Sequence, residues 1–224
     1  MFEAAAIKHA GRRLHEFSSV LDFGCGAGRL MQFLPCSLSI AGCDVNGPLV
    51  TFMNNWFPHA DVYQNSPEPP LKWPDGAFDL VYSFSVFSHL KQDSQSRWLA
   101  ELDRVGRPGC LYMITVQGDW WIESKFDQAQ QKMFRSAGFW YFDIHKSHTG
   151  EMDFPENYGS SLHTSDYVRE NWGQMFDILQ IYKGRPPMLY DDPALSDAHR
   201  SALETSRSMG QDLVVMRKRP VGID

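Results

Sequence analysis

The stretch VLDFGCGAG, residues 20–28, decides the fold class. Residues 20–23 form a short apolar run of the kind that makes a buried strand. Gly24, Gly26 and Gly28 follow directly, so the strand ends in a turn whose backbone can approach a ligand closely. A helix is expected over residues 29–34, which completes an arrangement in which a helix N-terminus faces a bound molecule.

The spacing of the glycines discriminates between classes of nucleotide. Dinucleotide-binding folds need GxGxxG, in which the third glycine packs the helix against the strand. Arg29 occupies that third position, so the pattern disfavours a nicotinamide or flavin site and a nicotinamide-dependent reductase. Asp22, at the end of the strand, would repel a pyrophosphate but suits a cationic ligand. Asp44 ends the next predicted strand and is placed to accept hydrogen bonds from a ribose diol.

Short apolar strands alternate with helices through the first half of the chain. This alternation is typical of a parallel sheet covered by helices on both faces. We expect strands at residues 20–23, 39–45, 60–64, 78–84 and 110–116, and helices at residues 3–17, 29–34, 49–57 and 92–105. A turn at residues 107–109 is expected to precede the strand at residues 110–116.

The pattern loosens after Gln117. We expect helices at residues 126–137 and 165–172, an irregular stretch at 139–165, and strands at 176–182 and 212–216. An insertion at residues 184–210, with a weak helix at 196–206, is expected to form a lid or a dimer contact.

Composition narrows the classes of partner. The 224 residues carry a net charge of -6, which disfavours nucleic acid as a substrate. No apolar run is long enough to cross a bilayer, and no signal peptide is recognisable, so a cytoplasmic location without membrane attachment is expected. The cysteines form no CxxC pair and the histidines no zinc pattern, so neither a disulfide nor a metal site is expected. The oligomeric state is left open.

Five segments in order resemble the successive motifs of class I S-adenosylmethionine-dependent methyltransferases. They are LDFGCGAGRL (21–30), GCDVN (42–46), PDGAFDLVYSFSVFSHL (74–90), WLAELDRVGRPGCLYMIT (98–115) and QDLVVMRK (211–218). The resemblance implies an α/β, Rossmann-like, doubly wound sheet of seven strands, mostly parallel with an antiparallel last strand, in three α/β/α layers. It further implies a single methyltransferase domain, with a cover helix at 1–17, a cofactor-binding core at 18–118, an acceptor or lid region at 119–175 and C-terminal strands at 176–224.

The same resemblance implies S-adenosylmethionine as cofactor, S-adenosylhomocysteine as product, and a role for each matching residue. The turn would surround the methionine end, Asp44 would hold the ribose, and Val45 would pack on adenine. Asn65 would meet the adenine amino group. The turn residues implied are Asp22, Gly24, Cys25, Gly26 and Gly28, and the residues expected near the sulfonium and the acceptor entrance are Ser83, Phe84 and Ser85.

An oxygen acceptor of high pKa needs a general base, and two residues are candidates. His89 follows the fourth strand and is expected either to act as the base or to cap the loop structurally. Asp119, just beyond the fifth strand, is the second candidate, because ligands gather outside the carboxyl ends of parallel strands.

The expected acceptor is a small molecule or a glycan, because VFSHL and QDLVV resemble segments of bacterial methyltransferases associated with glycan assembly. A phenolic or carboxylic metabolite is the close competitor. From another class of function, a non-catalytic S-adenosylmethionine-binding domain that supports a partner enzyme remains an alternative.

Overall fold

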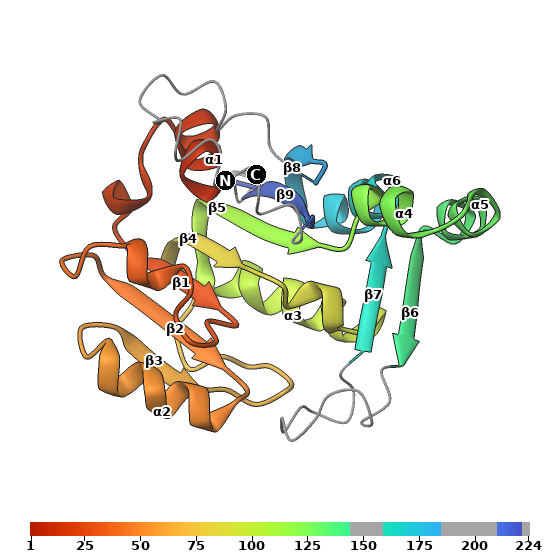
Figure 1. The fold of residues 1–224 in the computed structure, drawn as a ribbon. Coiled ribbons are helices and arrows are strands. Elements are labelled where there is room, and N and C mark those ends of the chain that lie inside the picture. The colour runs from red at the N-terminus through yellow and green to blue at the C-terminus, as the bar shows by residue number, and fades with distance from the viewer. Residues whose placement is uncertain (144–158, 185–209, 221–224) are drawn as a thin grey trace, which may run out of the picture.

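The computed structural model describes residues 1–143, 159–184 and 210–220. A seven-stranded sheet in the order β3-β2-β1-β4-β5-β9-β8 forms its centre (Figure 1). The strands are β1 (Val20–Phe23), β2 (Ile40–Asp44), β3 (Asp61–Gln64), β4 (Phe78–Ser83), β5 (Gly106–Val116), β8 (Phe176–Tyr182) and β9 (Asp212–Lys218). The first five pair in parallel, and β9 lies antiparallel between β5 and β8. The predicted fold class is therefore confirmed.

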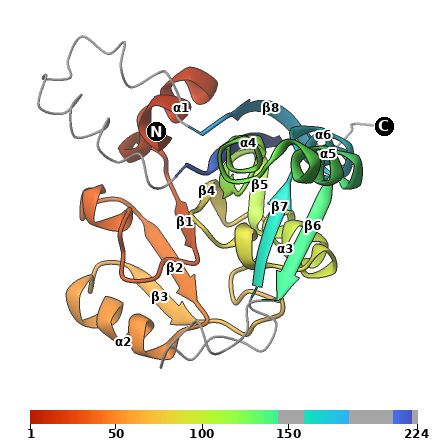
Figure 2. The same ribbon diagram turned by 45° about the vertical axis from the view of Figure 1, so that its right-hand side comes forward.

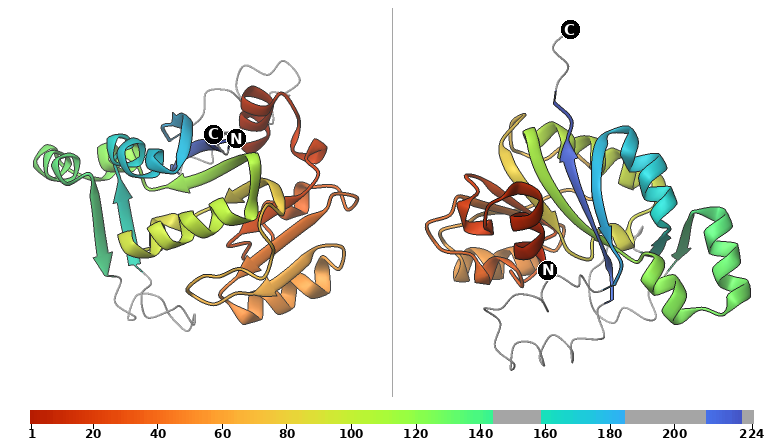
Figure 3. Two further views of the ribbon diagram at one scale, coloured as in Figure 1. Left: turned by 180° about the vertical axis from the view of Figure 1, so that it is seen from behind. Right: turned by 90° about the horizontal axis from the view of Figure 1, so that it is seen from above.

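Helices cover both faces of this sheet, and alternate residues of each strand point to opposite sides. On β1, Leu21 and Phe23 join one core, whereas Val20 joins the other. The first core packs against α3 (Gln92–Val105) and α6 (Ser165–Asn171), and the second against α1 (Phe2–Ala10) and α2 (Gly47–Trp56), as the views in Figure 3 illustrate. The result is a three-layer sandwich.

A small substructure lies beside the carboxyl end of β5. It consists of α4 (Asp119–Lys125), α5 (Gln128–Ala137) and the antiparallel pair β6 (Phe139–Asp143) and β7 (Gly159–His163), visible in Figure 2. A separate cluster built on Ile122, Phe134 and Leu162 packs it internally. The backbone N–H of His163 donates to the carbonyl of Gln117 at 2.9 Å, which fastens β7 to the end of β5.

Three helix expectations needed correction. The expected helix at 3–17 is shorter, because α1 ends at Ala10 and the Gly11 N–H closes it on the Ile7 carbonyl; a 3-10 turn, η1 (Leu14–Glu16), follows. In place of a helix at 29–34 there is only a 3-10 turn, η2 (Met31–Phe33), which Pro35 follows. The expected helix at 126–137 begins later, where the Asp127 side chain caps α5, and α4 before it was not expected.

Two strand expectations also differ from the structure. The expected turn at 107–109 lies within β5 rather than before it: Gly106 pairs with Phe78 and Leu111 with Leu80, and Gly109 between them has a φ of +80°. The segment expected to be irregular contains β6 and β7, which pair antiparallel, so the backbone groups along their shared edge are hydrogen-bonded to each other. The expected insertion at 184–210 falls almost wholly outside the described residues.

Within the described ranges, no helix has the length and apolar character that a bilayer-spanning helix needs.

Candidate donor-binding and catalytic site

The glycine-rich turn is held against the end of β2 by backbone hydrogen bonds. The N–H groups of Gly24 and Cys25 both donate to the carbonyl of Cys43, at 2.9 and 3.0 Å. Asp44, the last residue of β2, accepts from the Gly26 N–H through Oδ2 at 2.8 Å and from the Asn46 N–H through Oδ1 at 2.9 Å. Asp44 thus fixes the shape of the turn.

Gly24 and Gly26 both have positive φ angles, +76° and +52°, but they differ in their surroundings. A Cβ on Gly24 would lie 2.1 Å from Cγ2 of Val86, so the segment after β4 packs directly on the turn. A Cβ on Gly26 would meet nothing within 4 Å. The backbone of Gly26 therefore borders open space.

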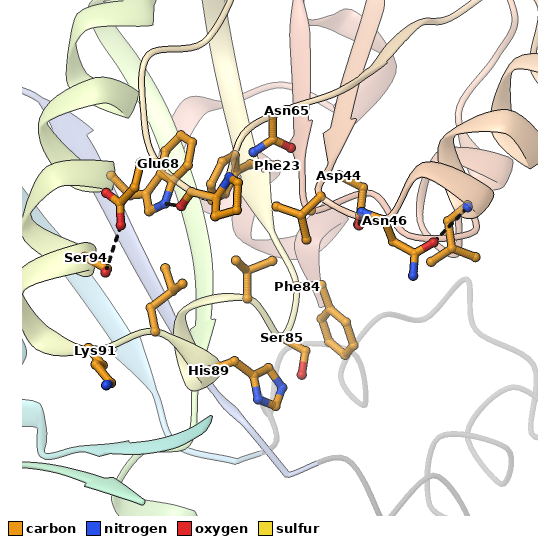
Figure 4. A pocket seen from close by; sticks show the side chains of 17 residues that line it. Phe23, Asp44, Asn46, Asn65, Glu68, Phe84, Ser85, His89, Lys91 and Ser94 are labelled. Atoms are coloured by element: carbon orange, nitrogen blue, oxygen red, sulfur yellow. Dashed lines mark hydrogen bonds between the residues drawn. The ribbon is translucent and has the colours of Figure 1, made fainter. Parts of the chain in front are cut away.

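A pocket of about 250 Å³ lies at the carboxyl ends of β1, β2, β3 and β4 (Figure 4). In this view Asp44 and Asn46 lie at one side of it and Glu68 and Ser94 at the other. The lining comprises Phe23, Gly24, Asp44, Val45, Asn46, Leu49, Asn65, Pro67, Glu68, Phe84, Ser85, Val86, His89, Leu90, Lys91, Ser94 and Trp98. It is an elongated, largely apolar site with polar groups along its length.

Many of the sequence-predicted site residues meet in this pocket. Those that line it are Gly24, Asp44, Val45, Asn65, Phe84, Ser85 and His89. Those that do not are Asp22, Cys25, Gly26, Gly28, Ser83 and Asp119. Ser83 is fully buried, and its hydroxyl has no hydrogen-bond partner among the described residues.

Asp22 lies beneath the turn rather than in the pocket wall. Its side chain is buried, and its Oδ2 accepts a hydrogen bond from the Tyr82 hydroxyl at 3.0 Å. Burial raises the pKa of Asp22 to about 7; the Tyr82 bond opposes this rise, and the nearby charge of Asp44 adds to it. The protonation of Asp22 therefore changes near neutral pH, immediately before the lining residues Phe23 and Gly24.

Ser85 enters the pocket with an unusual backbone conformation, a φ of +63°. Side-chain partners hold it there. Its N–H donates to Thr115 Oγ1 at 2.8 Å, and its hydroxyl accepts from Gln211 Nε2 at 2.8 Å. Thr115 Oγ1 in turn donates to Gln211 Oε1 at 2.6 Å, which closes the triangle. Positive φ in a residue other than glycine is concentrated at functional sites.

His89 lies on the 3-10 turn η3 (Phe87–His89), and its ring lines the pocket. Its Nδ1 lies 2.7 Å from the carbonyl oxygen of Gly159. Because a carbonyl can only accept, Nδ1 carries the proton, and in the neutral ring Nε2 is the basic nitrogen. Burial lowers the pKa of His89, and the bond to Gly159 partly opposes this effect.

Asp119 begins α4, outside the pocket lining. Its Oδ2 accepts from the hydroxyl of Ser165 at 2.5 Å and from the Ser165 N–H at 3.3 Å. In the structure this carboxylate joins α4 to the start of α6.

Several lining residues were not anticipated from the sequence. Asn46 caps α2, because its side chain accepts a hydrogen bond from the Leu49 N–H. Its position in the turn after β2 could have indicated that it reaches the pocket. No sequence pattern indicated that Glu68, Lys91 and Ser94 line the pocket, because a proline-rich loop and the start of α3 bring them there.

Residues 21–114 match the methyltransferase domain family. This part of the chain is therefore similar to a methyltransferase domain. It contains the glycine-rich turn, Asp44 and most of the described pocket.

Solved structures share the fold of this chain over nearly its whole length. An S-adenosylmethionine-dependent methyltransferase from Methanosarcina mazei is 15% identical with a TM-score of 0.63, covering 95% of this chain and 97% of its own. One from Mesorhizobium loti is 14% identical with a TM-score of 0.64, covering 96% of each chain. Geranyl diphosphate C-methyltransferase from Streptomyces coelicolor A3(2), solved with Mg²⁺, geranyl diphosphate and S-adenosylhomocysteine, is 12% identical with a TM-score of 0.56, covering 98% of this chain and 77% of its own.

The residues of the pocket fit a cationic nucleoside. An ionised carboxylate has about four acceptor positions, and the backbone occupies one on each oxygen of Asp44, so acceptor capacity is left for a ribose diol. Open space borders Gly26. Of the two carboxylates in the described lining, Glu68 is paired with Arg97 at 2.7 Å, so Asp44 is the one placed to attract a positively charged ligand.

Proposed function

We propose that the chain transfers a methyl group from S-adenosylmethionine to an oxygen nucleophile of a small-molecule or glycan acceptor, with His89 as general base. The observation that carries the proposal is the hydrogen bond from His89 Nδ1 to the Gly159 carbonyl, at the wall of the donor pocket. It leaves Nε2 as the nitrogen that can accept a proton. A lowered pKa keeps the ring neutral at neutral pH, which is the form a general base needs.

In this proposal the chain binds the donor through residues at successive strand ends. Asp44 accepts hydrogen bonds from the ribose hydroxyls, Val45 packs on adenine, and Asn65 bonds the adenine amino group. Gly24 and Gly26 let the backbone approach the methionine end, and the buried carboxylate of Asp22 favours positive charge there. These roles are supported by the position of Gly24, Asp44, Val45 and Asn65 in one pocket.

When bound, S-adenosylmethionine supplies a methyl group already activated by its sulfonium. The protein's task is then to orient the acceptor, exclude water and remove a proton. Phe84, Ser85 and His89 come from the segment after β4 and line the pocket, which is why we assign them to the acceptor side. Asp119 is not given a catalytic part, since its carboxylate is bonded to Ser165.

The acceptor class is tested by following release of S-adenosylhomocysteine from labelled donor over a panel of sugars, glycans, phenols and carboxylic acids. We expect turnover with a hydroxylated acceptor. If S-adenosylmethionine binds but no acceptor of any class is methylated, the chain is instead a non-catalytic donor-binding domain.

The base is tested with His89→Asn, which retains an N–H donor for the Gly159 carbonyl but has no basic nitrogen. We expect kcat to fall about 100-fold to 10,000-fold, the contribution typical of a positioned base. The dissociation constant of S-adenosylhomocysteine should change by less than about twofold, because none of the residues proposed to bind the methyl donor is changed. Unchanged kcat would reject His89 as the base.

A further inference from the structure

The turn η3, which carries His89, is packed beneath one face of β7. Three residues of β7, Gly159, Ser161 and His163, form hydrogen bonds to η3 or to the neighbouring helix α3. Gly159 accepts from His89 Nδ1 at 2.7 Å, Ser161 Oγ donates to the Phe87 carbonyl at 2.9 Å, and His163 Nε2 lies 3.0 Å from Oε1 of the Gln95 side chain.

Gln95 is the centre of this network. It lies on α3, and its side chain is almost completely buried, with 1% of its surface exposed. Its Nε2 donates to the carbonyls of Phe87 and Leu90, both at 3.0 Å. These two carbonyls flank His89 in the chain, so one amide group holds both sides of the turn that carries the proposed base.

The Gln95 amide also forms a hydrogen bond with His163. Because Nε2 of Gln95 donates to carbonyls, its Oε1 must accept, and His163 Nε2 is the donor. Burial lowers the pKa of His163 to about 3, so the ring stays neutral and its Nδ1 carries no proton. That buried Nδ1 has no partner among the described residues, an unfavourable arrangement that the remaining contacts must offset.

We propose that Gln95, with its hydrogen-bond partner His163, is a positioning residue for His89. By fixing η3 against β7 it keeps the His89 Nδ1–H directed at the Gly159 carbonyl and so makes Nε2 the basic nitrogen. The functional consequence rests on the proposed role of His89 as base, whereas the effect on the His89 ring can be measured without any acceptor.

Three variants separate positioning from general stabilisation. Gln95→Met keeps the approximate length of the side chain and removes its bonds to Phe87 and Leu90. The double variant Q95M/H163F also removes the stranded N–H of His163 and serves if the single variant folds poorly. Ser160→Ala is the matched control, since Ser160 loses a hydrogen bond of 2.7 Å to Gln117 Oε1 rather than one to η3.

The decisive measurement is the tautomer of His89, read from side-chain ¹⁵N NMR shifts above its pKa, with the signal assigned by its loss in His89→Asn. We expect the Nδ1–H form in the wild type and in Ser160→Ala. In Gln95→Met and Q95M/H163F we expect a shift toward the Nε2–H form that an unconstrained imidazole prefers. Retention of the wild-type tautomer in both Gln95 variants would overturn the proposal.

Steady-state kinetics provide a second test, with an acceptor identified in the panel of sugars, glycans, phenols and carboxylic acids. We expect about a 100-fold fall in kcat for Gln95→Met with KM for the acceptor little changed, as for a displaced catalytic group. S-adenosylhomocysteine should bind all these variants within about twofold of the wild type. A changed tautomer together with full turnover in His89→Asn would leave the positioning intact and refute the base.

Discussion

At the scale of single residues, two carboxylates beside the pocket lie in different surroundings. Asp44 borders the pocket and is bonded by backbone N–H groups, whereas Asp22 is buried and shares a hydrogen bond with Tyr82. Burial gives Asp22 a pKa of about 7. Since its ordinary value is 3.8, the folded state favours the protonated form, and the Asp22 contribution to stability declines as the pH rises from about 4 to about 7.

This shifted pKa predicts a pH-dependent preference for the charged donor. An ionised Asp22 attracts the sulfonium of S-adenosylmethionine, and S-adenosylhomocysteine lacks that charge. Between pH 6 and pH 8 we expect the affinity for S-adenosylmethionine to rise about threefold to tenfold more than that for S-adenosylhomocysteine, following the direction of the linkage. Calorimetric titration of both ligands measures the difference, and Asp22→Asn should abolish it. An equal pH dependence of the two affinities would show that the charge of Asp22 does not act on the sulfonium.

The pocket residues that sequence reasoning could identify share one property: they follow strand ends. Gly24, Asp44, Val45 and Asn65 could be assigned because parallel strands deliver their carboxyl ends to one edge of the sheet. Glu68 and Trp98 could not, because the course of a loop and the packing of a helix decide whether they reach the pocket. The sequence also showed Asp22 at a strand end but not that it would be buried beneath Tyr82.

At the scale of elements, the turn after β1 packs closely against Val86 at Gly24. Sequence patterns found β1 and the glycines, but they overestimated the helix that follows, of which only η2 forms. They also overlooked β6 and β7, since aromatic and polar residues with no clear alternation gave no strand signal. Those two strands exist through their mutual pairing.

The turn allows a prediction that contrasts two glycines of similar backbone conformation. For Gly26→Ala we expect a loss of about 1–2 kcal/mol in the free energy of unfolding, the cost of a left-handed residue. Gly24→Ala adds overpacking against Val86, about 1–3 kcal/mol more. Urea denaturation measures both, and the further change Val86→Ala should recover part of the extra loss. Equal losses at the two positions would show that the contact with Val86 does not constrain the turn.

At the scale of the whole molecule, donor binding should stabilise the fold by mass action. At 100 times its dissociation constant, a ligand that binds only the folded state adds about 2.7 kcal/mol, and a chain of this size gains roughly 2–4 °C in Tm per kcal/mol. We therefore expect S-adenosylhomocysteine to raise the Tm by about 5–10 °C. Thermal scans with NADH as control should show no rise.

The same thermal scan tests the role of Asp44 at the end of β2. Asp44→Ala removes two backbone hydrogen bonds as well as the proposed ribose contact, so the ligand-free Tm should fall and the shift with S-adenosylhomocysteine should largely vanish. Asp177→Asn, on the exposed surface of β8, controls for loss of a carboxylate. A full ligand-induced shift in Asp44→Ala would contradict the assignment of that residue to the donor.

The place of β9 has a consequence for the nascent chain. This strand is formed by residues 212–218, yet it is hydrogen-bonded on both sides, to β5 and to β8. Until the ribosome has translated β9, β5 and β8 each have an edge to which no strand is paired. Open edges invite pairing with other chains. During synthesis, we therefore expect the chain to be most prone to aggregation in the interval before residue 218 emerges.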